Sequence, residues 1–452
     1  MNFFAYVVMF GWLPVVLYIF GKLPTRRAIV FCFITAWLFL PLADLKFVAG
    51  IPPYTKMSAT CYSVLLATAL FDAKRFSSFK LSWLDLPALI WFTCPFASSI
   101  SNDLGWYDGL STTVAQTMTW GVPYYLGRIY LNSLDGLRQL AIGIFIGGLV
   151  YVPFCLLEVR ISPQLHHLVY GFSSGHFNEE LRYGGYRPEV FMESGLMVGD
   201  WLMVATLSGF WLWQSDLIKQ LWGIAIKWLV VALLVTTVLV KATGAIGLLA
   251  LGAVALLITK WFRNSLLVLV MVACISLYLY DGVSGNFSGD QLVKTASAYI
   301  NPDRAASLQF RFDNEKLLSA KARQRMLFGW GEWGRSRVYN QFGKDISVTD
   351  SLWIIAFGTK GLVGLISLMA SFLLPVVRFV QRYPASLWIN YKIAPAAVIA
   401  VILVLYMIDC LLNAMVNPVY MVACGGLAGL VLKQQTKTTR VVMPVRLPIT
   451  ER

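Results

Sequence analysis

Runs of mainly apolar residues recur along most of the chain, and each is about as long as the ~20 residues that a helix needs to cross a membrane. Inside lipid such runs must form helices, because every backbone amide needs a hydrogen-bond partner within its own segment. The pattern therefore predicts an all-α fold, a polytopic transmembrane helical bundle of about 12–13 spans. The candidate spans lie near residues 3–20, 28–43, 58–72, 84–99, 112–131, 137–157, 189–212, 222–240, 243–259, 264–281, 349–377, 393–412 and 416–432.

Two longer polar segments interrupt this series of apolar runs and divide the predicted helices into three groups. No internal repeat relates two halves of the chain, which disfavours transporter folds built from paired halves. The predicted organisation is transmembrane helices in 1–157, an external loop in 158–188, helices in 189–281, a large, partly helical external loop in 282–348, helices in 349–432 and a tail in 433–452.

Basic residues in the short connections predict which way the chain is inserted. Alternate connections carry Lys and Arg, and by the positive-inside rule these connections lie in the cytoplasm. The N-terminus is then expected outside and the C-terminus inside. The residues that carry this signal are Lys22, Arg26, Arg27, Lys74, Arg75, Lys80, Arg138, Lys260, Arg263, Arg378, Arg382 and Lys392.

The composition agrees with a membrane protein, since 58% of the residues are hydrophobic and the mean hydropathy is +0.66. No compact basic domain carries the net charge of +14, so no nucleic-acid partner is expected. The seven cysteines are scattered through the apolar runs and favour neither disulfides nor a thiolate metal site. His166, His167 and His176 lack a helical ligand spacing, and phosphate-cradling loops are absent, so we expect no metal and no cofactor.

The large external loop is predicted to contain a helix. Pro302 suits the first helical position, and the helical pattern continues as far as Gly329. Arg304 and Arg311 share one face of this helix, and Glu315 lies four residues beyond Arg311, where it can pair with that arginine. The alternative is an amphipathic helix lying on the membrane, with its basic residues toward anionic headgroups.

The stretch GWGEWGRSRVYN, which follows this helix, combines sharp turns with side chains suited to a phosphorylated sugar. Its three glycines allow the backbone to turn and to approach a ligand closely. Trp330 and Trp333 offer flat faces for a sugar ring, and Arg335 and Arg337 offer planar forks of donors for phosphate oxygens. An aromatic belt at the membrane interface with a flexible turn is the alternative, but it leaves the two arginines unexplained.

A second cluster of Arg, Tyr and Gly residues ends the first external loop. Arg182, Tyr183, Tyr186 and Arg187 lie on the same predicted side of the membrane as the tryptophan-rich stretch. Pro188 is then predicted to start the next span. The two loops together therefore bring several arginines and aromatic rings to one side of the membrane.

Three acidic residues occur at the outer end of that span. Glu189, Glu193 and Asp200 are spaced by four and seven residues, so on a helix they share one face, which must look into the protein or a wet cavity. Acidic residues inside a membrane are costly and are therefore candidates for function. The structural alternative is a buried pair between Glu193 and a nearby arginine, and Lys241 and Lys360 are further candidate partners.

Three motifs are similar to those of a known family. The segments SVTDSLWIIAFGTKGLVGLISL, LFGWG and RYGGYRPEVF, together with the long external loop, resemble the O-antigen ligase and O-antigen polymerase superfamily of bacterial envelope glycosyltransferases, in particular its exopolysaccharide polymerase-like branch. The similarity in layout covers roughly residues 120–430. It implies a multi-pass protein of the bacterial inner (cytoplasmic) membrane, with the N-terminus and both external loops in the periplasm and the C-terminus in the cytoplasm.

The resemblance also implies an activity. Members of the superfamily take a glycan from a polyprenyl diphosphate carrier at the periplasmic face and pass it to an acceptor, without metal or nucleotide. The family's ligases carry a His-Asn pair where Asp350 and Ser351 stand here, so this chain departs from the ligase pattern and ligation to lipid A is disfavoured. The family's diphosphate-binding arginines correspond to Arg187 and Arg311.

The predicted function is that of a polysaccharide polymerase, which joins a polyprenyl diphosphate-linked oligosaccharide to an acceptor glycan. Arginines offset the charge of the leaving diphosphate, and either Asp350 or Glu193 accepts the proton of the attacking hydroxyl group. Further expected partners are the lipid bilayer and other polysaccharide assembly proteins. The alternatives are a flippase or exporter of lipid-linked oligosaccharide, an O-antigen ligase and a non-catalytic assembly partner. The expected substrate-binding residues are Arg182, Arg187, Arg311, Arg335, Arg337, Tyr183, Tyr186, Trp330 and Trp333.

Overall fold

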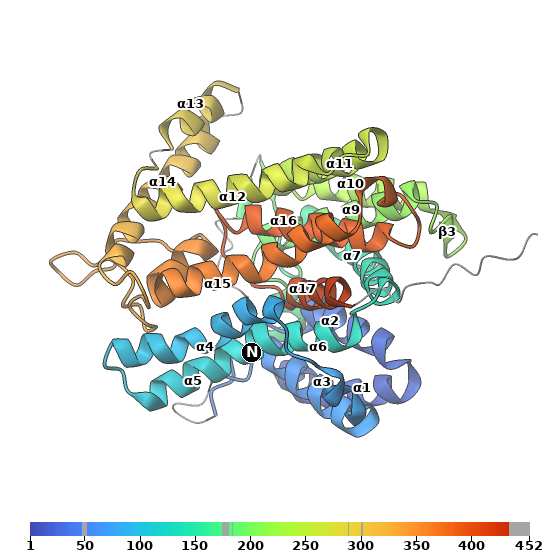
Figure 1. Cartoon of the computed structure of the whole chain (residues 1–452), viewed down its shortest axis with the longest axis horizontal. Coiled ribbons are helices and arrows are strands. Elements are labelled where there is room, and N and C mark those ends of the chain that lie inside the picture. Colours follow the sequence, from blue (N-terminus) through green and yellow to red (C-terminus); the bar gives the residue numbers. More distant parts are fainter. Residues whose placement is uncertain (48–51, 174–179, 183, 288, 300–301, 434–452) are drawn as a thin grey trace, which may run out of the picture.

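The computed structural model describes residues 1–47, 52–173, 180–182, 184–287, 289–299 and 302–433, and this part of the chain is mostly helical (Figure 1). The N-terminal helices are α1 (Phe3–Lys22), α2 (Thr25–Phe39), α3 (Lys56–Phe71), α4 (Leu86–Ser101), α5 (Trp106–Gln116), α6 (Val122–Tyr130), α7 (Leu134–Ile161) and α8 (Leu165–Tyr170). The later helices are α9 (Gly195–Gln214), α10 (Ile226–Leu239), α11 (Thr243–Phe262), α12 (Leu266–Ser284), α13 (Asp290–Tyr299), α14 (Pro302–Arg323), α15 (Leu352–Arg382), α16 (Ala394–Asp409) and α17 (Pro418–Leu432).

Short elements connect these helices. A π-helical turn (Thr117–Gly121) joins α5 to α6, so that the predicted span at 112–131 is helical and begins earlier, at Trp106. Two small antiparallel hairpins, which were not predicted, are formed by β1 (Leu181–Arg182) with β2 (Gly185–Tyr186) and by β3 (Gln220–Leu221) with β4 (Ile224–Ala225).

Within the described residues, six helices are long and apolar enough to cross a membrane, namely α1, α7, α9, α11, α12 and α15. Four shorter helices, α3, α10, α16 and α17, are also apolar. These helices indicate a multi-pass membrane protein with a helical fold, in agreement with the class predicted from the sequence. The number of spans and the side of the membrane at which each terminus lies stay predictions.

The core of the bundle is built around α16, whose residues from Ala394 to Met407 are all buried. A helix that is apolar on every side must lie inside the protein, and α7, α9, α11, α12, α15 and α17 pack against it. Figure 1 shows α15, α16 and α17 in the middle of the molecule, with α10 to α12 on one side and the N-terminal helices α1 to α6 on the other.

Glycines bring α17 close to α6. A Cβ atom on Gly425 would lie 2.0 Å from the carbonyl oxygen of Tyr124, and one on Gly127 would lie 2.1 Å from that of Val422. Small residues at a crossing let two backbones approach, which is how helices gain packing energy in a membrane that offers little hydrophobic drive.

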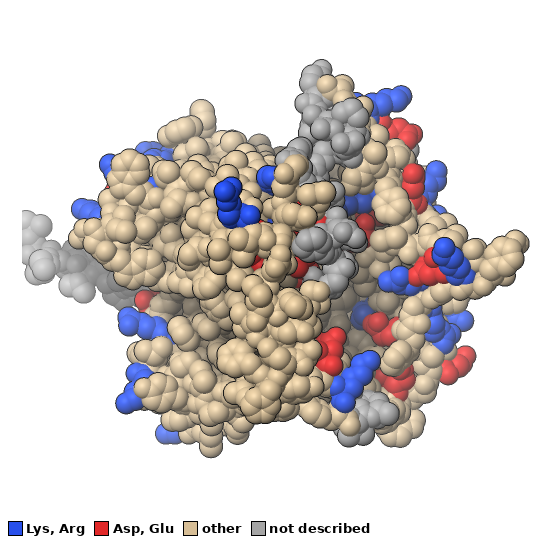
Figure 2. Space-filling model, turned by 180° about the vertical axis from the view of Figure 1, so that it is seen from behind, with Lys and Arg blue, Asp and Glu red and all other residues tan. Residues whose placement is uncertain are grey.

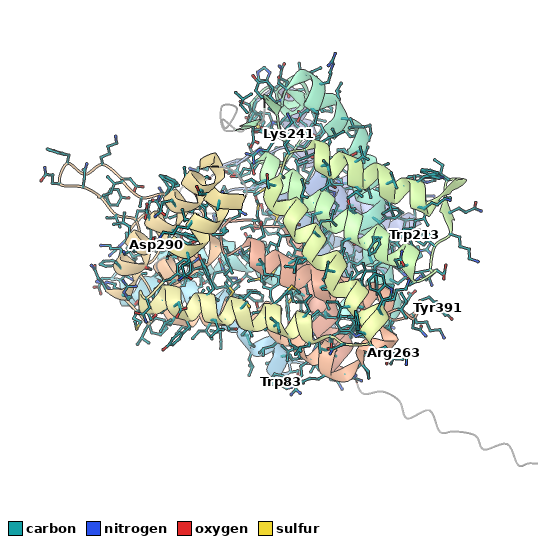
Figure 3. All side chains as sticks on the ribbon, turned by 90° about the horizontal axis from the view of Figure 1, so that it is seen from above. Trp83, Trp213, Lys241, Arg263, Asp290 and Tyr391 are labelled. Carbon is teal, nitrogen blue, oxygen red and sulfur yellow. The ribbon has the colours of Figure 1, made fainter. Side chains whose placement is uncertain are left out.

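Helix ends that carry two of the predicted basic connections lie close to each other. Arg26, in the first turn of α2, lies 3.6 Å from Asp135 at the start of α7. Figure 3 shows Arg263 and Tyr391, from two further predicted basic connections, at one end of the molecule and Asp290 of α13 at the opposite end. In Figure 2 basic and acidic side chains gather together along the side formed by α14 and the segment that follows it.

The prediction that Glu189, Glu193 and Asp200 share a helix face is wrong, because α9 begins at Gly195 and not at Pro188. The two glutamates lie before the helix in an irregular segment, and only the aspartate lies within it.

A buried carboxylate explains the late start of α9. Glu158, near the end of α7, is fully buried, and its Oε2 atom accepts hydrogen bonds from the N–H groups of Glu189 and Val190 at 2.8 and 2.7 Å. These bonds hold a turn in which Val190 has a φ of 54°, and Ser194 then caps α9. The turn depends on a residue about thirty positions away, as expected for a polar group that must find partners when buried.

The predicted helix of the large external loop exists as α14, but it ends at Arg323 and not at Gly329. Its first described residue is Pro302, and the side chain of Arg304 lies outside the described part of the chain. The residues after Arg323 form turns, and Gly329 has a φ of 68°.

α15 is broken in its middle at Gly361, whose φ of 63° and ψ of −162° are not helical. In an unbroken helix the carbonyl groups of Gly358 and Thr359 would accept from the N–H groups of Leu362 and Val363. The break therefore frees four backbone groups in the interior of a candidate membrane-spanning helix.

The tryptophan-rich stretch satisfies these freed groups. The N–H groups of Trp330 and Gly331 donate to the two freed carbonyl groups at 2.9 and 3.0 Å, and the two freed N–H groups donate to the carbonyl oxygens of Met326 and Leu327 at 2.7 and 3.2 Å. An unsatisfied backbone group in lipid costs several kcal/mol. The glycines of this stretch therefore do allow a close approach, but what they approach is the backbone of α15.

Candidate functional site

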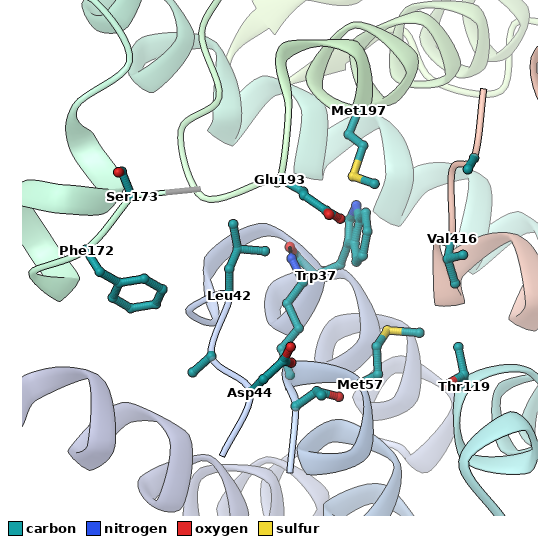
Figure 4. A pocket seen from close by; sticks show the side chains of 14 residues that line it. Trp37, Leu42, Asp44, Met57, Thr119, Phe172, Ser173, Glu193, Met197 and Val416 are labelled. Atoms are coloured by element: carbon teal, nitrogen blue, oxygen red, sulfur yellow. Dashed lines mark hydrogen bonds between the residues drawn. The ribbon is translucent and has the colours of Figure 1, made fainter. Parts of the chain in front are cut away.

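A cavity of about 530 Å³ lies between the N-terminal helices, the start of α9 and the connection before α17. We call it the Glu193 cavity. In Figure 4 Glu193 and Asp44 extend into it from opposite sides, and the Trp37 ring lies beside Glu193. Its lining residues are Trp37, Leu42, Ala43, Asp44, Thr55, Lys56, Met57, Thr119, Phe172, Ser173, Glu193, Met197, Ala414 and Val416.

Lys56 places a buried cation in the wall of this cavity. It is the first residue of α3, where Thr55 and Ser58 form a capping box that fixes the start of the helix. The Lys56 ammonium group lies 4.2 Å from the centre of the Trp37 ring and 3.5 Å from the Trp37 carbonyl oxygen, and the charge of Glu193 attracts it. The cavity thus presents a cation, two carboxylates and a flat ring to a ligand.

His166 fixes the part of the wall that contains Leu42. Its Nε2 atom accepts a hydrogen bond from the Leu42 N–H group at 3.2 Å, and its Nδ1 atom donates to the Phe172 carbonyl oxygen at 2.7 Å. Burial lowers the pKa of His166 below its ordinary value of 6.5, and the charges of Lys56 and His167 act in the same direction. The neutral ring is therefore a structural support for the cavity wall.

Two buried carboxyl groups lie deeper in the bundle. Asp200 stands one turn along α9 from Met197, which lines the cavity, and accepts a 2.5 Å hydrogen bond from the Tyr420 hydroxyl group. The charge of Asp409 acts on Asp200, and Asp409 accepts a 2.8 Å bond from the Asn413 amide. One oxygen of each carboxyl group has no hydrogen-bond partner in the described part of the chain. Two carboxyl oxygens without a partner among the described residues therefore lie in the interior of the bundle.

Arg311 of α14 reaches the connection before α17 from the opposite side. Its Nη1 atom donates at 3.0 Å both to the Leu412 carbonyl oxygen and to Asn413 Oδ1, and its charge acts on Asp409. Ala414, the next residue, lines the Glu193 cavity. Arg311 does not itself line the cavity, but it holds the connection that carries Ala414, and its charge acts on one member of the carboxyl pair.

Asp350 lies near the same connection. The N–H group of Leu352 donates to the carbonyl oxygens of Cys410 and Asn413, each at 3.1 Å, and joins the start of α15 to this connection. Asp350 is half-buried and does not line the Glu193 cavity. Of the two carboxylates predicted to be catalytic, only Glu193 faces the cavity.

Glu315 does not form the predicted direct pair with Arg311. Its buried carboxylate accepts hydrogen bonds from the Tyr278 hydroxyl group at 2.6 Å and from the Trp353 indole N–H group at 3.1 Å. Burial raises the pKa of Glu315, and these hydrogen bonds and the Arg311 charge oppose that effect. Glu315 thus joins α14 to α12 and α15.

Arg187 is engaged in a buried ion pair. It is 5% exposed, and its Nε atom donates to Glu180 Oε2 at 2.6 Å. The other oxygen of Glu180 accepts the N–H group of Gly195 at 3.0 Å, so the pair holds the β1–β2 hairpin against the first residue of α9. Arg187 does not line the Glu193 cavity. This geometry gives it a structural role, and it no longer supports Arg187 as a diphosphate ligand.

The other predicted substrate-binding residues of the Arg, Tyr and Gly cluster give little information about the site. Tyr186 is half-buried in β2, the side chain of Arg182 is outside the described part, and Tyr183 lies outside the described residues altogether. Lys241 reaches the hairpin backbone, since a Cβ atom on Gly185 would lie 2.5 Å from its Nζ atom.

The aromatic rings of the tryptophan-rich stretch lie apart from the Glu193 cavity, which none of them lines. The Trp330 ring is covered by cations, with Lys321 Nζ 3.8 Å and the Arg325 guanidinium carbon 4.9 Å from the ring centre. Trp333 is 77% exposed, and its indole N–H group donates to Asp108 Oδ1 at 2.7 Å. Trp333 is therefore the more exposed of the two tryptophan rings in this stretch.

Of the two arginines in the tryptophan-rich stretch, one is engaged by neighbouring side chains and the other is not. Arg337 donates to Asp345 Oδ2 at 2.6 Å and to Thr349 Oγ1 at 3.3 Å, and this bond from Arg337 holds the pKa of Asp345 below its usual value. Arg335 is half-buried, and among the described residues its guanidinium group has no ion-pair or hydrogen-bond partner. Arg337 thus orders the loop, while Arg335 remains available to a ligand.

Lys360 does not pair with the acidic residues of α9. It is buried beside the break in α15, and its Nζ atom donates to Glu332 Oε1 at 2.8 Å and to Thr359 Oγ1 at 3.2 Å. This ion pair is a further contact between α15 and the tryptophan-rich stretch.

The sequence analysis did not single out Lys56, Asn413 or Tyr420. Lys56 carries a usable signal, because it is a basic residue at the predicted outer end of a span, where the positive-inside rule gives no reason for one. Asn413 and Tyr420 carry none, since polar residues near helix ends are common.

No protein-family model matches the chain, and a comparison with curated proteins found no matching sequence. In the described ranges no group of three or more His, Cys, Asp or Glu side chains is placed to hold a metal ion, and His176 lies outside those ranges.

Proposed function

We propose that the protein is a polysaccharide polymerase that transfers glycan from a polyprenyl diphosphate carrier to an acceptor sugar. The observation that carries the proposal is the Glu193 cavity, in which a carboxylate and a buried ammonium group face the same space. Its volume of about 530 Å³ is within the usual range of small-molecule sites, roughly 300–1,000 Å³.

The reaction needs a base that accepts the proton of the attacking hydroxyl group, and positive charge that stabilises the leaving diphosphate. The acceptor hydroxyl oxygen attacks the anomeric carbon, the bond from that carbon to the diphosphate oxygen breaks, and polyprenyl diphosphate leaves with the bonding electron pair. Glu193 takes the hydroxyl proton as general base. Lys56 and Arg311 offset the negative charge that develops on the diphosphate, so the reaction needs no metal.

Other predicted residues have less direct parts in this proposal. Asp350 stands near Arg311 but away from the cavity, which favours Glu193 as the base. Trp333 and Arg335, on the stretch after α14, would bind the growing glycan outside the cavity. Arg337 orders the loop that carries them.

The proposal includes an orientation. The Glu193 cavity belongs to the end opposite the predicted basic connections, and the positive-inside rule places those connections in the cytoplasm. The cavity then opens toward the periplasm of a bacterial inner membrane, where the lipid-linked donor is available after export.

A reconstituted transfer assay tests the function. Wild type in proteoliposomes, supplied with polyprenyl diphosphate-linked repeat units and EDTA, should give a ladder of lengthened glycans. Glu193→Gln should give at least about 100-fold less product because the proton acceptor is lost. Asp290→Asn, which changes an exposed carboxylate on α13, should match wild type.

Two outcomes would contradict the proposal. A ladder from Glu193→Gln equal to that of Asp290→Asn would show that Glu193 is not the base. Movement of the lipid-linked oligosaccharide across the liposome membrane with no change in glycan length would identify the protein as a flippase or exporter.

A further inference from the structure

A second cavity, of about 660 Å³, runs between α2 and α7. Its lining residues recur every three or four positions on both helices, so that each helix presents one continuous face to it. On α7 this face extends from Arg138 to Val150, and on α2 from Arg27 to Phe39. We call it the α2–α7 groove.

Glycines on α7 set how closely the two helices approach. A Cβ atom on Gly143 would lie 2.5 Å from Val30 Cγ1, and one on Gly147 would lie 2.8 Å from Ile34 Cγ2. The helices therefore touch along this line, while Ile142 and other larger side chains stand beside it and form an apolar wall.

One end of the groove is polar and basic. Arg27 and Arg138 are exposed there, and within the described residues neither guanidinium group makes an ion pair or a hydrogen bond. The neighbouring Asp135 is already engaged, since Arg26 lies 3.6 Å from it and Gln139 donates to it at 2.9 Å. The mouth of the groove thus has two cations without a partner among the described residues, and one carboxylate whose Oδ2 atom meets Arg26 and Gln139.

We propose that the α2–α7 groove binds an anionic phospholipid, with the phosphate group at Arg27 and Arg138 and one acyl chain along the apolar wall. Guanidinium groups form paired hydrogen bonds with phosphate oxygens, and basic pockets between membrane helices on the cytoplasmic side favour anionic headgroups. The site is distinct from the Glu193 cavity and does not depend on the proposed polymerase activity.

The length of the groove favours a phospholipid over the longer polyprenyl carrier. From Arg138 to Val150 the axis of α7 rises by about 18 Å, which is a little more than half of the roughly 30 Å of hydrocarbon in a bilayer. One acyl chain of a single leaflet fills that distance, whereas a polyprenyl chain would extend well beyond it.

Native mass spectrometry of the full chain in detergent tests this inference. Wild type, titrated separately with phosphatidylglycerol and phosphatidylcholine of the same acyl chains, should retain one phosphatidylglycerol in preference. Arg27→Gln combined with Arg138→Gln should lower that retention about tenfold or more, to the level of phosphatidylcholine. Arg263→Gln, which changes an arginine outside the groove, should leave it unchanged.

A second variant tests the acyl chain. Ile142→Trp adds bulk to the apolar wall and should reduce retention of both phospholipids. The proposal is overturned if wild type binds both lipids equally, if the double arginine variant still prefers phosphatidylglycerol as Arg263→Gln does, or if polyprenyl phosphate displaces the phospholipid at equal concentration.

Discussion

Gly361→Ala should prevent the protein from reaching its folded state, or should lower its melting temperature by many degrees. The φ of 63° and ψ of −162° at this position belong to a region that glycine alone occupies readily, and forcing another residue there costs about 1–3 kcal/mol. The added Cβ atom would also lie 2.3 Å from the carbonyl carbon and oxygen of Leu327. It would push away the segment that satisfies the four freed backbone groups of α15, each of which costs several kcal/mol if left unpaired in lipid.

Substitutions of two other glycines separate the cost of a positive φ from the cost of the clash that the added Cβ atom makes. Gly343 also has a positive φ, of 74°, but has open space where a Cβ atom would go, so Gly343→Ala should cost only about 1–2 kcal/mol. Gly244, in α11, has neither constraint, and Gly244→Ala should be neutral or slightly stabilising. Thermal unfolding followed by size-exclusion chromatography measures all three. Equal melting temperatures for Gly361→Ala and Gly343→Ala would show that the insertion at the break does not stabilise the fold.

Arg311→Ala should lower glycan transfer about 100-fold or more, since it removes the guanidinium group proposed to offset the diphosphate. It also removes two hydrogen bonds to the connection before α17, each at 3.0 Å, so a moderate loss of stability is expected as well. Arg311→Lys should keep a small part of the activity, because lysine supplies the charge without the paired donors. Initial transfer rates at several donor concentrations give the measurement.

The matched control lies on the same helix. Lys316 is exposed on α14, and the described residues offer its ammonium group no partner, so Lys316→Ala should transfer glycan at the wild-type rate. A rate for Arg311→Ala equal to that of Lys316→Ala, with both proteins folded, would remove Arg311 from the proposed site.

The sequence predicts the helices well where apolar length alone decides them. It fails where a turn depends on a distant partner, as at Pro188, where the backbone turn is held by Glu158 of the preceding span. The break in α15 cannot be predicted for the same reason. The apolar pattern continues through Gly361, while the backbone groups that satisfy the broken helix lie on the distant stretch around Trp330.

The sequence also predicts the candidate site only in part. The chemistry of their side chains singles out Glu193, Asp350 and Arg311 in the sequence, and in the structure Arg311 and the segment of Asp350 meet the connection that lines the Glu193 cavity. Arg187 has the same chemistry but is paired with Glu180, which only three-dimensional proximity reveals. Residue type and predicted side of the membrane thus select candidates, while burial and partners decide between them.

The most direct test of the central claim asks where the donor binds. Wild type in lipid nanodiscs would be irradiated with a polyprenyl diphosphate-linked repeat unit that carries a photoreactive group on its first sugar, and the labelled peptides identified by mass spectrometry. The account predicts labels on residues that line the Glu193 cavity, such as Asp44, Met57 and Met197, with competition by unlabelled donor. Labels confined to the α2–α7 groove, or spread over lipid-facing helices without competition, would contradict it.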